Sequence, residues 1–324
     1  MKAALCKTLD GPEAIVIEDI PTPEPGPGEV RVRVKAVALN FLDTLICRGK
    51  YQYKPALPFS PVSELAGVVD KLGADVTGLK VGQRVCGFTG WGCAREFAVV
   101  KASAMVPVPD GVSDEVACGV SVTYGTAMHG LVDRGHLKAG ETVAVLGASG
   151  GAGLAAVELA KLLGAKVVAA ASSADKLVIC KARGADVLVD YSSGDLKQLL
   201  RDATGGPGPD VIYDCVGGDY AEPALRAINW MGRYLVIGFA AGSIPKIPIN
   251  LTLLKSCDIV GVFWGENAAR FPAPHAANVA RVLGWVAAGK LKPHTHAVMP
   301  FDKIREAIAM LDRREVTGKL VLTV

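Results

Sequence analysis

A continuously apolar segment, Thr142–Leu146, runs directly into a glycine-rich turn with the sequence Gly147-Ala148-Ser149-Gly150-Gly151-Ala152-Gly153. An uninterrupted apolar run of this length is typical of a strand that is buried on both faces at the centre of a parallel sheet. A candidate helix, Gly151–Leu163, begins within the turn. A strand, a tight glycine turn and a helix in this order predict a layered α/β domain.

Candidate strands and helices alternate from this point on. Repeated βαβ winding predicts a doubly wound parallel sheet of the Rossmann type, covered on both faces. The candidate strands are Thr142–Leu146, Lys166–Ala171, Asp186–Val189, Asp210–Asp214, Arg233–Ile237 and Asp258–Phe263, and the helices between them are Gly151–Leu163, Ala174–Arg183, Asp195–Asp202 and Tyr220–Asn229. Two more helices, Ala276–Ala288 and Asp302–Asp312, and a strand, Lys319–Thr323, are expected near the end of the chain.

The first 120 residues have a different pattern. Apolar side chains from Val30 to Ala36 alternate with Arg31, Arg33 and Lys35, which predicts a strand with one solvent-exposed face. Short apolar pieces at Gly67–Val69, Val81–Val85 and Phe97–Val100 are bounded by turn residues or charged residues. Short strands of this kind predict a compact, partly closed β domain.

Composition and charge exclude several classes of protein. Of the 324 residues 50% are apolar, which excludes a disordered chain, and the length is sufficient for two domains. A net charge of +3 is too small to indicate nucleic acid or an anionic membrane as a partner. The scattered cysteines are expected to be reduced and buried, and no apolar run predicts a signal peptide or a membrane span. We therefore expect a cytoplasmic protein.

The glycine turn carries the strongest chemical signal in the sequence. It differs by one residue from the dinucleotide fingerprint G-x-G-x-x-G, since Ala148 stands at the first glycine position. Gly150 allows the backbone to approach a pyrophosphate, and Gly153 allows the helix to pack close to the strand. Free N–H groups at the start of the helix then bind the phosphate. An ordinary tight turn is the alternative, but the strand before it and the helix after it favour a dinucleotide.

The end of the second strand indicates which dinucleotide is bound. An NAD site usually carries an acidic residue there, whereas this strand ends in Ser172 and Ser173. Asp175 already lies inside the following helix, beside Lys176. Hydroxyls and a lysine without a carboxylate favour the 2′-phosphate of NADPH. Lys176 as an ordinary solvated helix residue is the other interpretation.

Together with motifs in the first half of the chain, these residues resemble the zinc-independent quinone oxidoreductases, the zeta-crystallin-like branch of the medium-chain dehydrogenase/reductase superfamily. The resemblance covers essentially the whole chain. The segments that carry it are Asn40-Phe41-Leu42-Asp43-Thr44, Lys54-Pro55-Ala56-Leu57-Pro58-Phe59, Thr123-Tyr124-Gly125-Thr126-Ala127, the glycine turn, and Thr317-Gly318-Lys319.

The resemblance implies a GroES-like domain in residues 1–122, a Rossmann NADP-binding domain in 123–264 and a return of residues 265–324 to the first domain, with NADPH in the cleft between them. Asn40 and Thr123 match positions near the nicotinamide. The other matching positions are Ser149, Gly150, Gly151 and Ala152 at the pyrophosphate, Ser172, Lys176 and Tyr191 at the 2′-phosphate, Val216 on the adenosine side, Gly238, Phe239, Val262, Phe263 and Trp264 at the nicotinamide end, and Arg314 and Lys319 near the cofactor.

The chain departs from its relatives at several positions. Many members carry Tyr after the Asn-x-x-Asp-Thr run, whereas this chain has Leu45, and Tyr51 is left either to line the cleft or to lie on a surface loop. Pro61-Val62 replaces the usual Pro-Gly turn. The zinc ligands of related alcohol dehydrogenases are also missing, because Asn40 and Ser63 stand at the first cysteine and histidine positions, and Cys118 alone cannot build a tetrahedral site. We expect no metal.

Without a Lewis acid, a simple ketone is poorly activated for hydride transfer, whereas a quinone or an α,β-unsaturated carbonyl is already electrophilic. We therefore predict an NADPH:quinone oxidoreductase-type enzyme whose candidate catalytic residues are Asn40, Tyr51 and Thr123. Tyr51 or Thr123 is expected to donate a hydrogen bond to the acceptor oxygen, and solvent is an alternative source of the proton. An enoyl-thioester reductase of the same fold and a largely non-catalytic NADPH-binding protein remain alternatives.

The uncharged segment Ile259–Trp264 is expected to form the last strand of the Rossmann sheet. An apolar edge strand of this kind invites aggregation unless it is covered. Pairing with the same strand of a second copy would cover it and produce two-fold symmetry. The sequence therefore predicts a homodimer.

Overall fold

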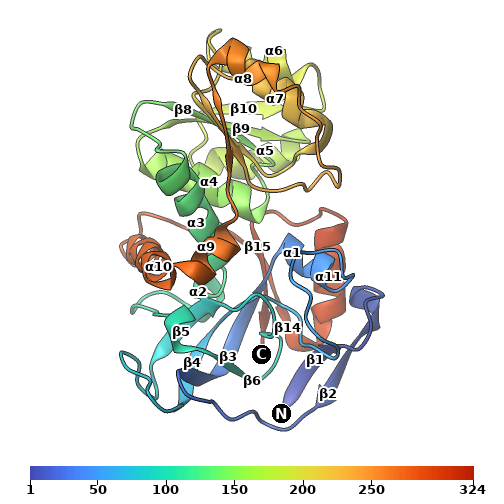
Figure 1. Ribbon diagram of the computed structural model, residues 1–324, viewed down its shortest axis with the longest axis vertical. Coiled ribbons are helices and arrows are strands. Elements are labelled where there is room, and N and C mark those ends of the chain that lie inside the picture. The colour runs from blue at the N-terminus through green and yellow to red at the C-terminus, as the bar shows by residue number, and fades with distance from the viewer. The chain divides into compact units, whose positions relative to one another are not determined.

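The computed structural model describes all residues from 1 to 324 and consists of two compact units (Figure 1). The first unit comprises Met1–Val122 and Asn267–Val324, and the second comprises Thr123–Glu266. The two ends of the chain thus fold together, and the middle of the chain forms a unit of its own.

The first unit is built around a seven-stranded sheet with the order β14-β15-β3-β4-β5-β7, in which β6 also pairs with β3. A separate antiparallel pair, β1 with β2, completes its strands. The bounds are β1 (Lys2–Cys6), β2 (Ile15–Asp19), β3 (Glu29–Leu39), β4 (Glu64–Leu72), β5 (Arg84–Phe88), β6 (Phe97–Lys101), β7 (Met105–Pro107), β14 (Thr295–Pro300) and β15 (Lys319–Thr323). The predicted β-rich character of this region is confirmed.

Strand β3 organises the first unit because it pairs with β4, β6 and β15. Its apolar side chains from Val30 to Ala36 are almost completely buried, while Arg33 and Lys35 are exposed, as the period of two predicts. The pairing with β15 is antiparallel and places Leu320 opposite Leu39. The last strand of the chain therefore lies beside the end of β3, next to Asn40.

Four helices belong wholly to the first unit: α1 (Phe41–Ile46), α2 (Asp114–Ala117), α10 (Pro272–Ala287) and α11 (Ile304–Asp312). Helix α10 begins four residues before the predicted Ala276, because prolines are tolerated in the first turn of a helix. The predicted strand Val81–Val85 is wrong in its bounds. Val81 is 61% exposed and Gly82 has φ +84°, so a turn precedes β5, which begins at Arg84.

The second unit contains a six-stranded parallel sheet with the order β10-β9-β8-β11-β12-β13. Its strands are β8 (Thr142–Leu146), β9 (Lys166–Ala171), β10 (Val187–Asp190), β11 (Val211–Asp214), β12 (Arg233–Val236) and β13 (Asp258–Gly261). All five pairings between these strands are parallel, and the chain winds outward from β8 in both directions. The predicted doubly wound Rossmann sheet is confirmed.

Helices cover this sheet on both faces. The helices that lie wholly or partly in the second unit are α3 (Val120–Met128), which a π-helical turn (His129–Arg134) continues, α4 (Gly151–Leu162), α5 (Ala174–Ala182), α6 (Leu196–Ala203), α7 (Ala221–Ala227), α8 (Asn250–Lys255) and α9 (Trp264–Arg270). Helix α4 packs against β8 and β9, α5 packs against β9 and β10, and α6 packs against α7. Because β8 is covered on both sides, each residue from Val143 to Leu146 is completely buried.

The last strand of the parallel sheet is shorter than predicted. Strand β13 ends at Gly261, and Trp264 begins helix α9 instead of closing the strand. The strand does lie at the edge of the sheet, and Ile259 is 38% exposed.

Two properties of the whole chain follow from these elements. None of its helices combines the length and the apolar character that a membrane crossing requires. All eight cysteines are free thiols, and all except Cys215 are buried, as expected for small apolar side chains.

Candidate functional site

The glycine turn links β8 to α4 at the carboxyl end of the central strand. Gly147 has φ +70°, a conformation that favours glycine, and its carbonyl oxygen accepts a hydrogen bond of 3.1 Å from Gly150 N. Gly150 is the N-cap of α4, with φ −75° and ψ 171°. The turn therefore brings the N–H groups of Gly151 and Ala152, the first residues of α4, to the edge of the sheet. Ser149, beside them, is 7% exposed.

The two glycines of the fingerprint have different surroundings. A Cβ atom on Gly153 would overlap the carbonyl oxygen of Gly147 and lie 2.8 Å from Ala148 Cα. A Cβ atom on Gly150 would lie 3.5 Å from the same carbonyl oxygen, which is an ordinary contact. Gly153 is therefore required by helix-to-strand packing, whereas Gly150 leaves an open approach to the backbone.

The start of α4 offers its N–H groups to a ligand. No side chain caps this helix, and its first turn holds no acidic residue. The next two helices behave differently, because the Ser173 hydroxyl accepts from Lys176 N in α5 and the Asp195 carboxylate accepts from Lys197 N in α6. Uncapped N–H groups at the positive end of a twelve-residue helix fit a pyrophosphate.

The end of β9 carries the group predicted for a 2′-phosphate. Lys176 Nζ lies 3.5 Å from Ser172 Oγ, so the ammonium and the hydroxyl are neighbours at the end of β9. Asp175 lies in the first turn of α5 and is exposed. A cation and a hydroxyl without a buried carboxylate beside them suit a phosphate dianion.

Tyr191 follows β10 at the same edge of the sheet, and its N–H donates to Ala171 O at 3.1 Å. Its ring lies 4.6 Å from the ring of Tyr220, centroid to centroid, in a tilted arrangement. Tyr220 was not among the predicted site residues. An aromatic residue just after the fourth parallel strand was the available signal, but its contact with Tyr191 depends on the order of the strands.

Asp214, at the end of β11, shapes the adjoining loop. Its Oδ1 atom accepts from Val216 N at 2.7 Å and from Gly217 N at 3.0 Å, and its Oδ2 atom accepts from the Tyr234 hydroxyl. Burial raises the pKa of this carboxyl, while these donors oppose the shift. Val216 is thus held in place by a buried carboxylate that sequence analysis did not assign to the site.

The remaining predicted positions of the second unit follow β12 and β13. Gly238 N donates to Asp214 O at 3.3 Å, and Phe239 beside it is 38% exposed. Val262 N donates to Val236 O at 3.1 Å. Trp264 is buried, and its ring occupies the space beside Gly125 of α3, while Phe263 is 47% exposed.

Asn40 lies at the centre of a buried polar cluster in the first unit. It is the N-cap of α1, and its backbone N–H donates to Asp43 Oδ2 at 2.7 Å. Its Oδ1 atom accepts from Lys319 Nζ at 2.7 Å, and its Nδ2 atom donates to Glu64 Oε1 at 2.9 Å. Burial raises the pKa of Asp43 to about 7, although the Asn40 N–H and the Lys319 charge oppose the shift.

Lys319 takes part in this cluster with all of its donors. Its Nζ atom also donates to Glu64 Oε1 at 2.7 Å and to Leu39 O at 2.9 Å, and the residue is 5% exposed. The structure thus brings Lys319 to Asn40 and not to open solvent. Arg314 follows α11 in a left-handed conformation, φ +58°, and its N–H donates to Leu311 O.

Tyr51 belongs to an aromatic cluster in the first unit. Its ring meets that of Tyr53 edge to face at 5.4 Å, and Tyr53 lies 6.0 Å from the ring of Trp91. Burial raises the pKa of Tyr51 to about 12, so this hydroxyl is protonated at neutral pH.

Comparison with known proteins assigns both units. Residues 151–280 match the family model described as zinc-binding dehydrogenase, and residues 26–110 match the alcohol dehydrogenase GroES-like domain. The chain is 40% identical over 325 residues to the quinone oxidoreductase-like protein 2 homolog of Nematostella vectensis, covering 99% of this chain and 88% of that protein. The chain belongs to the quinone oxidoreductase family of medium-chain dehydrogenase/reductases.

Solved structures agree with this assignment. A quinone oxidoreductase from Pseudomonas syringae is 31% identical, with a TM-score of 0.92 and coverage of 100% of this chain and 99% of that one. The Escherichia coli quinone oxidoreductase complexed with NADPH is 26% identical, with a TM-score of 0.91 and full coverage of both chains. The predicted family and the predicted combination of a GroES-like and a Rossmann fold are both confirmed.

Next to Thr123 on α3, this quinone oxidoreductase family member carries a second buried polar group. Thr123 itself is 2% exposed. The Tyr124 hydroxyl donates to Glu158 Oε2, which joins α3 to α4, and Arg183 lies 3.6 Å from Glu158 Oε1. Burial raises the pKa of Glu158 to about 7, against the effects of Tyr124 and Arg183. Sequence analysis gave no sign of this group.

The raised pKa of Glu158 predicts a pH-dependent stability. The folded protein holds this proton at pH values where an unfolded glutamate, with a pKa near 4.5, has lost it. The contribution of this protonated carboxyl to the stability of the fold is complete below pH 4.5 and is lost as the pH rises to about 7. Glu158→Gln keeps an acceptor for Tyr124 without the charge. Its free energy of unfolding, relative to that of wild type, should therefore rise by about 3 kcal/mol as the pH rises from about 4.5 to about 7.

Urea unfolding of both proteins at about pH 5 and about pH 8 measures this difference. Glu222→Gln, which removes an exposed carboxylate paired with Arg226, is the control and should give the same small difference at both pH values. If the difference in the free energy of unfolding between wild type and Glu158→Gln does not change with pH, the raised pKa of Glu158 is contradicted.

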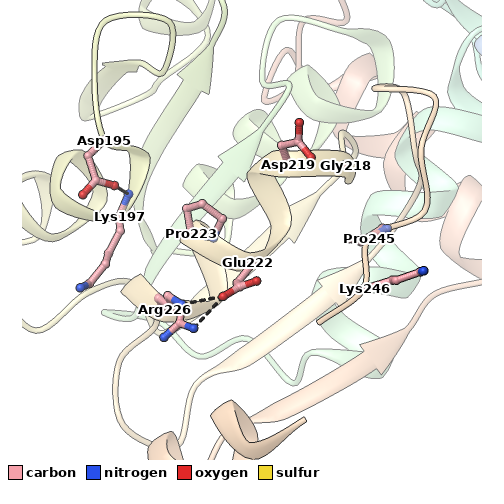
Figure 2. A pocket seen from close by; sticks show the side chains of 9 residues that line it. All are labelled: Asp195, Lys197, Gly218, Asp219, Glu222, Pro223, Arg226, Pro245 and Lys246. Atoms are coloured by element: carbon pink, nitrogen blue, oxygen red, sulfur yellow. Dashed lines mark hydrogen bonds and ion pairs between the residues drawn. The ribbon is translucent and has the colours of Figure 1, made fainter. Parts of the chain in front are cut away.

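A pocket of about 480 Å³ also lies in the second unit (Figure 2). Its acidic and basic side chains are equal in number, and Arg226 is paired with Glu222 at 2.6 Å. It holds none of the predicted site residues. Its lining residues are Asp195, Lys197, Gly218, Asp219, Glu222, Pro223, Arg226, Pro245 and Lys246.

Proposed function

We propose that this chain is an NADPH-dependent oxidoreductase that transfers hydride to a quinone or to an α,β-unsaturated carbonyl compound without a metal ion. When bound, NADPH supplies the hydride. The glycine turn would hold its pyrophosphate, Ser172, Lys176 and Tyr191 would hold its 2′-phosphate, and Val216 would lie on the adenosine side. The observation that carries the cofactor assignment is the uncapped start of α4 beside the Ser172–Lys176 pair.

The class of acceptor follows from the chemistry of the first unit. Asn40 and Ser63 stand where zinc-dependent relatives carry a cysteine and a histidine, and neither supplies a thiolate or an imidazole. An acceptor that forms a delocalised anion needs orientation more than Lewis-acid activation. Asn40 and Thr123 are the proposed residues at the nicotinamide end, together with Gly238, Phe239, Val262, Phe263 and Trp264, and the protonated Tyr51 is a proposed donor to the acceptor oxygen.

A panel of quinones, enals and enoyl thioesters tests this proposal. Each acceptor is scored by the loss of reduced-nicotinamide absorbance, with NADH in parallel. Turnover of quinones or enals with NADPH is the expected result. Turnover confined to enoyl thioesters would reassign the acceptor, and NADPH binding without turnover of any acceptor would make the chain a binding protein. Activity that is lost on chelation and restored by zinc would refute the metal-free chemistry.

Lys176→Glu tests the cofactor assignment separately. The carboxylate would face the 2′-phosphate, so the NADPH dissociation constant should rise by about 30-fold while that of NADH changes by less than about 3-fold. Lys181→Glu, in the last turn of the same helix, makes the same charge change away from Ser172 and is the matched control. Fluorescence titration of both cofactors measures the effect. Equal losses for NADPH and NADH would remove Lys176 from the site.

We also propose that the chain forms a homodimer through the β13 edge. Ile259 and Phe263 are exposed there, and the nearby α8 carries Leu253, 79% exposed, and Leu254, 64% exposed. Exposed apolar side chains at and near an open sheet edge fit a two-fold contact between copies. Sedimentation should give twice the chain mass of 33.7 kDa, and Ile259→Lys should shift the protein toward the monomer. A wild-type monomer at micromolar concentration would contradict the proposal.

A further inference from the structure

The cluster around Asn40 is made by residues far apart in the sequence. Lys319 begins β15, Asn40 follows β3, and Glu64 begins β4. The antiparallel register that pairs Leu320 with Leu39 brings Lys319 beside Asn40, 279 residues away along the chain. Three adjacent strands of one sheet therefore deliver the members of this cluster, and the sheet fixes their backbones.

Within the cluster, the charges of Glu64 and Lys319 balance each other. Glu64 is completely buried, and the Lys319 ammonium at 2.7 Å is the cation that it contacts. Removing the cation of such a pair would leave an uncompensated buried charge. Glu64 Oε2 also accepts from Val122 N, at the start of α3, at 2.8 Å. Thr123 is the next residue of that helix, so the ion pair also anchors the backbone that leads into it.

The ammonium is enclosed by the other side chains of the cluster. It contacts Asn40 and Glu64, and Ser63 Oγ is 3.4 Å from Asn40 Nδ2. A Cβ atom on Gly119, next to Cys118, would lie 3.2 Å from Lys319 Cε, so the glycine leaves room for the lysine stem. The fixed positive charge of this cluster is thus supplied by a side chain.

The network also fixes the orientation of the Asn40 amide. Its oxygen faces an ammonium and its nitrogen faces a carboxylate. Rotating the amide by half a turn would set its NH₂ group against the ammonium and its oxygen against the carboxylate, so one orientation is enforced. The second Nδ2 hydrogen makes only long hydrogen bonds, of 3.4 Å, to Ser63 Oγ and Ala38 O. It is held less tightly than the first, so a carbonyl oxygen at a normal hydrogen-bond distance would compete for it.

We propose that Lys319 is a positioning residue, the fixed cation of this cluster, which orients the Asn40 amide so that one Nδ2 N–H is presented to a carbonyl oxygen of the cofactor or the acceptor. The donor is strengthened because hydrogen bonds in a chain polarise one another, and here the chain begins at a buried cation. This inference rests on the proposed function, since it assigns a partner to the donor.

Two substitutions separate positioning from charge neutralisation. Lys319→Met leaves Glu64 unpaired and should lower the melting temperature strongly. The double variant Lys319→Met/Glu64→Gln removes both charges and should recover most of that stability. Its kcat/KM with NADPH should nevertheless stay about 30-fold below wild type, since the Asn40 amide is no longer held. Recovery of both stability and kcat/KM would show that Lys319 only neutralises Glu64, and would overturn the proposal.

Arg233→Met is the matched control. Arg233 and Glu141 form a bidentate, mostly buried ion pair in the second unit, away from the predicted site residues. Its loss should lower the melting temperature and leave kcat/KM within about 2-fold of wild type. Two constants show whether the carbonyl oxygen belongs to the cofactor or to the acceptor. If the amide contacts the cofactor, the NADPH dissociation constant should rise in the double variant. If it contacts the acceptor, the KM of the acceptor should rise.

A readout without turnover keeps this test separate from the proposed function. Labelling with ¹⁵N-asparagine makes only a few side-chain amides visible by NMR. The pair of amide signals that is absent from the spectrum of Asn40→Ser belongs to Asn40. Wild type should show Asn40 Nδ2 proton shifts displaced from those of a solvated asparagine amide, because its hydrogen bonds are fixed, and the double variant should show shifts close to those of a solvated amide. Solvated-amide shifts already present in wild type would refute positioning, even if the enzyme is active. Displaced shifts in a chain that turns over no acceptor would uphold positioning while the proposed function fails. The asparagines of the chain are Asn40, Asn229, Asn250, Asn267 and Asn278.

Discussion

Alanine at position 153 is expected to destabilise the second unit by about 3 kcal/mol or more, because its methyl group has no space between α4 and the turn. The added Cβ atom would overlap Gly147 O and lie 2.8 Å from Ala148 Cα. Both neighbours are backbone atoms, and Ala148 follows the completely buried β8, so neither can move as a flexible side chain does. The clash has to be relieved by shifting α4 away from the sheet.

Gly150→Ala provides the contrast within the same turn. Its backbone conformation, φ −75° and ψ 171°, suits any residue, and its Cβ atom would make only an ordinary contact. The free energy of unfolding should therefore change by less than about 1 kcal/mol. The methyl group would stand at the approach to the α4 N–H groups, so the NADPH dissociation constant should rise by about 10-fold or more.

Urea unfolding and NADPH titration of both variants separate packing from binding. We expect Gly153→Ala to fail mainly in stability and Gly150→Ala mainly in affinity. Equal stabilities of the two variants would contradict the packing role of Gly153. Unchanged NADPH affinity in a folded Gly150→Ala variant would remove the turn from the cofactor site.

The parallel sheet was predictable because its signals are local. Strands β8 and β9 begin and end at the predicted residues, since uninterrupted apolar runs bounded by turn residues leave little choice of register. The strand predicted at Val81–Val85 failed for a local reason as well. Valines on either side of Gly82 read as a strand, but the glycine adopts φ +84° and turns the chain.

The candidate site was predictable only in part. The glycine turn and the Ser172–Lys176 pair are each contiguous or nearly so, and a motif or a family resemblance is sufficient to find them. The Lys319–Glu64 pair was not predictable, because 255 residues separate its members and only the order β15-β3-β4 brings them together. Asp214 was not predicted, because an acidic residue at the end of a strand is usually a solvated turn residue. Only the neighbouring strand, which brings Tyr234 beside it, shows that it is buried.

Asp214→Ala is expected to cost about 4 kcal/mol, because it leaves three buried donors without an acceptor. These donors are Val216 N, Gly217 N and the hydroxyl of Tyr234, and Asp214 itself is 3% exposed. Asp214→Asn keeps the shape and an acceptor for the two backbone groups, and should cost about 1 kcal/mol. Asp195→Ala, which removes an exposed helix cap, should likewise cost about 1 kcal/mol and is the control.

The same substitution should also weaken NADPH binding, because the loop that carries Val216 is held in place by this carboxylate. Under conditions where Asp214→Ala remains folded, its NADPH dissociation constant should rise by about 10-fold, and that of Asp195→Ala should not change. Asp214→Asn should bind nearly as wild type does, since both loop N–H groups keep their acceptor. An Asp214→Ala variant with wild-type stability would show that water replaces the carboxylate. A destabilised variant with unchanged affinity would instead separate this loop from the adenosine side of the cofactor.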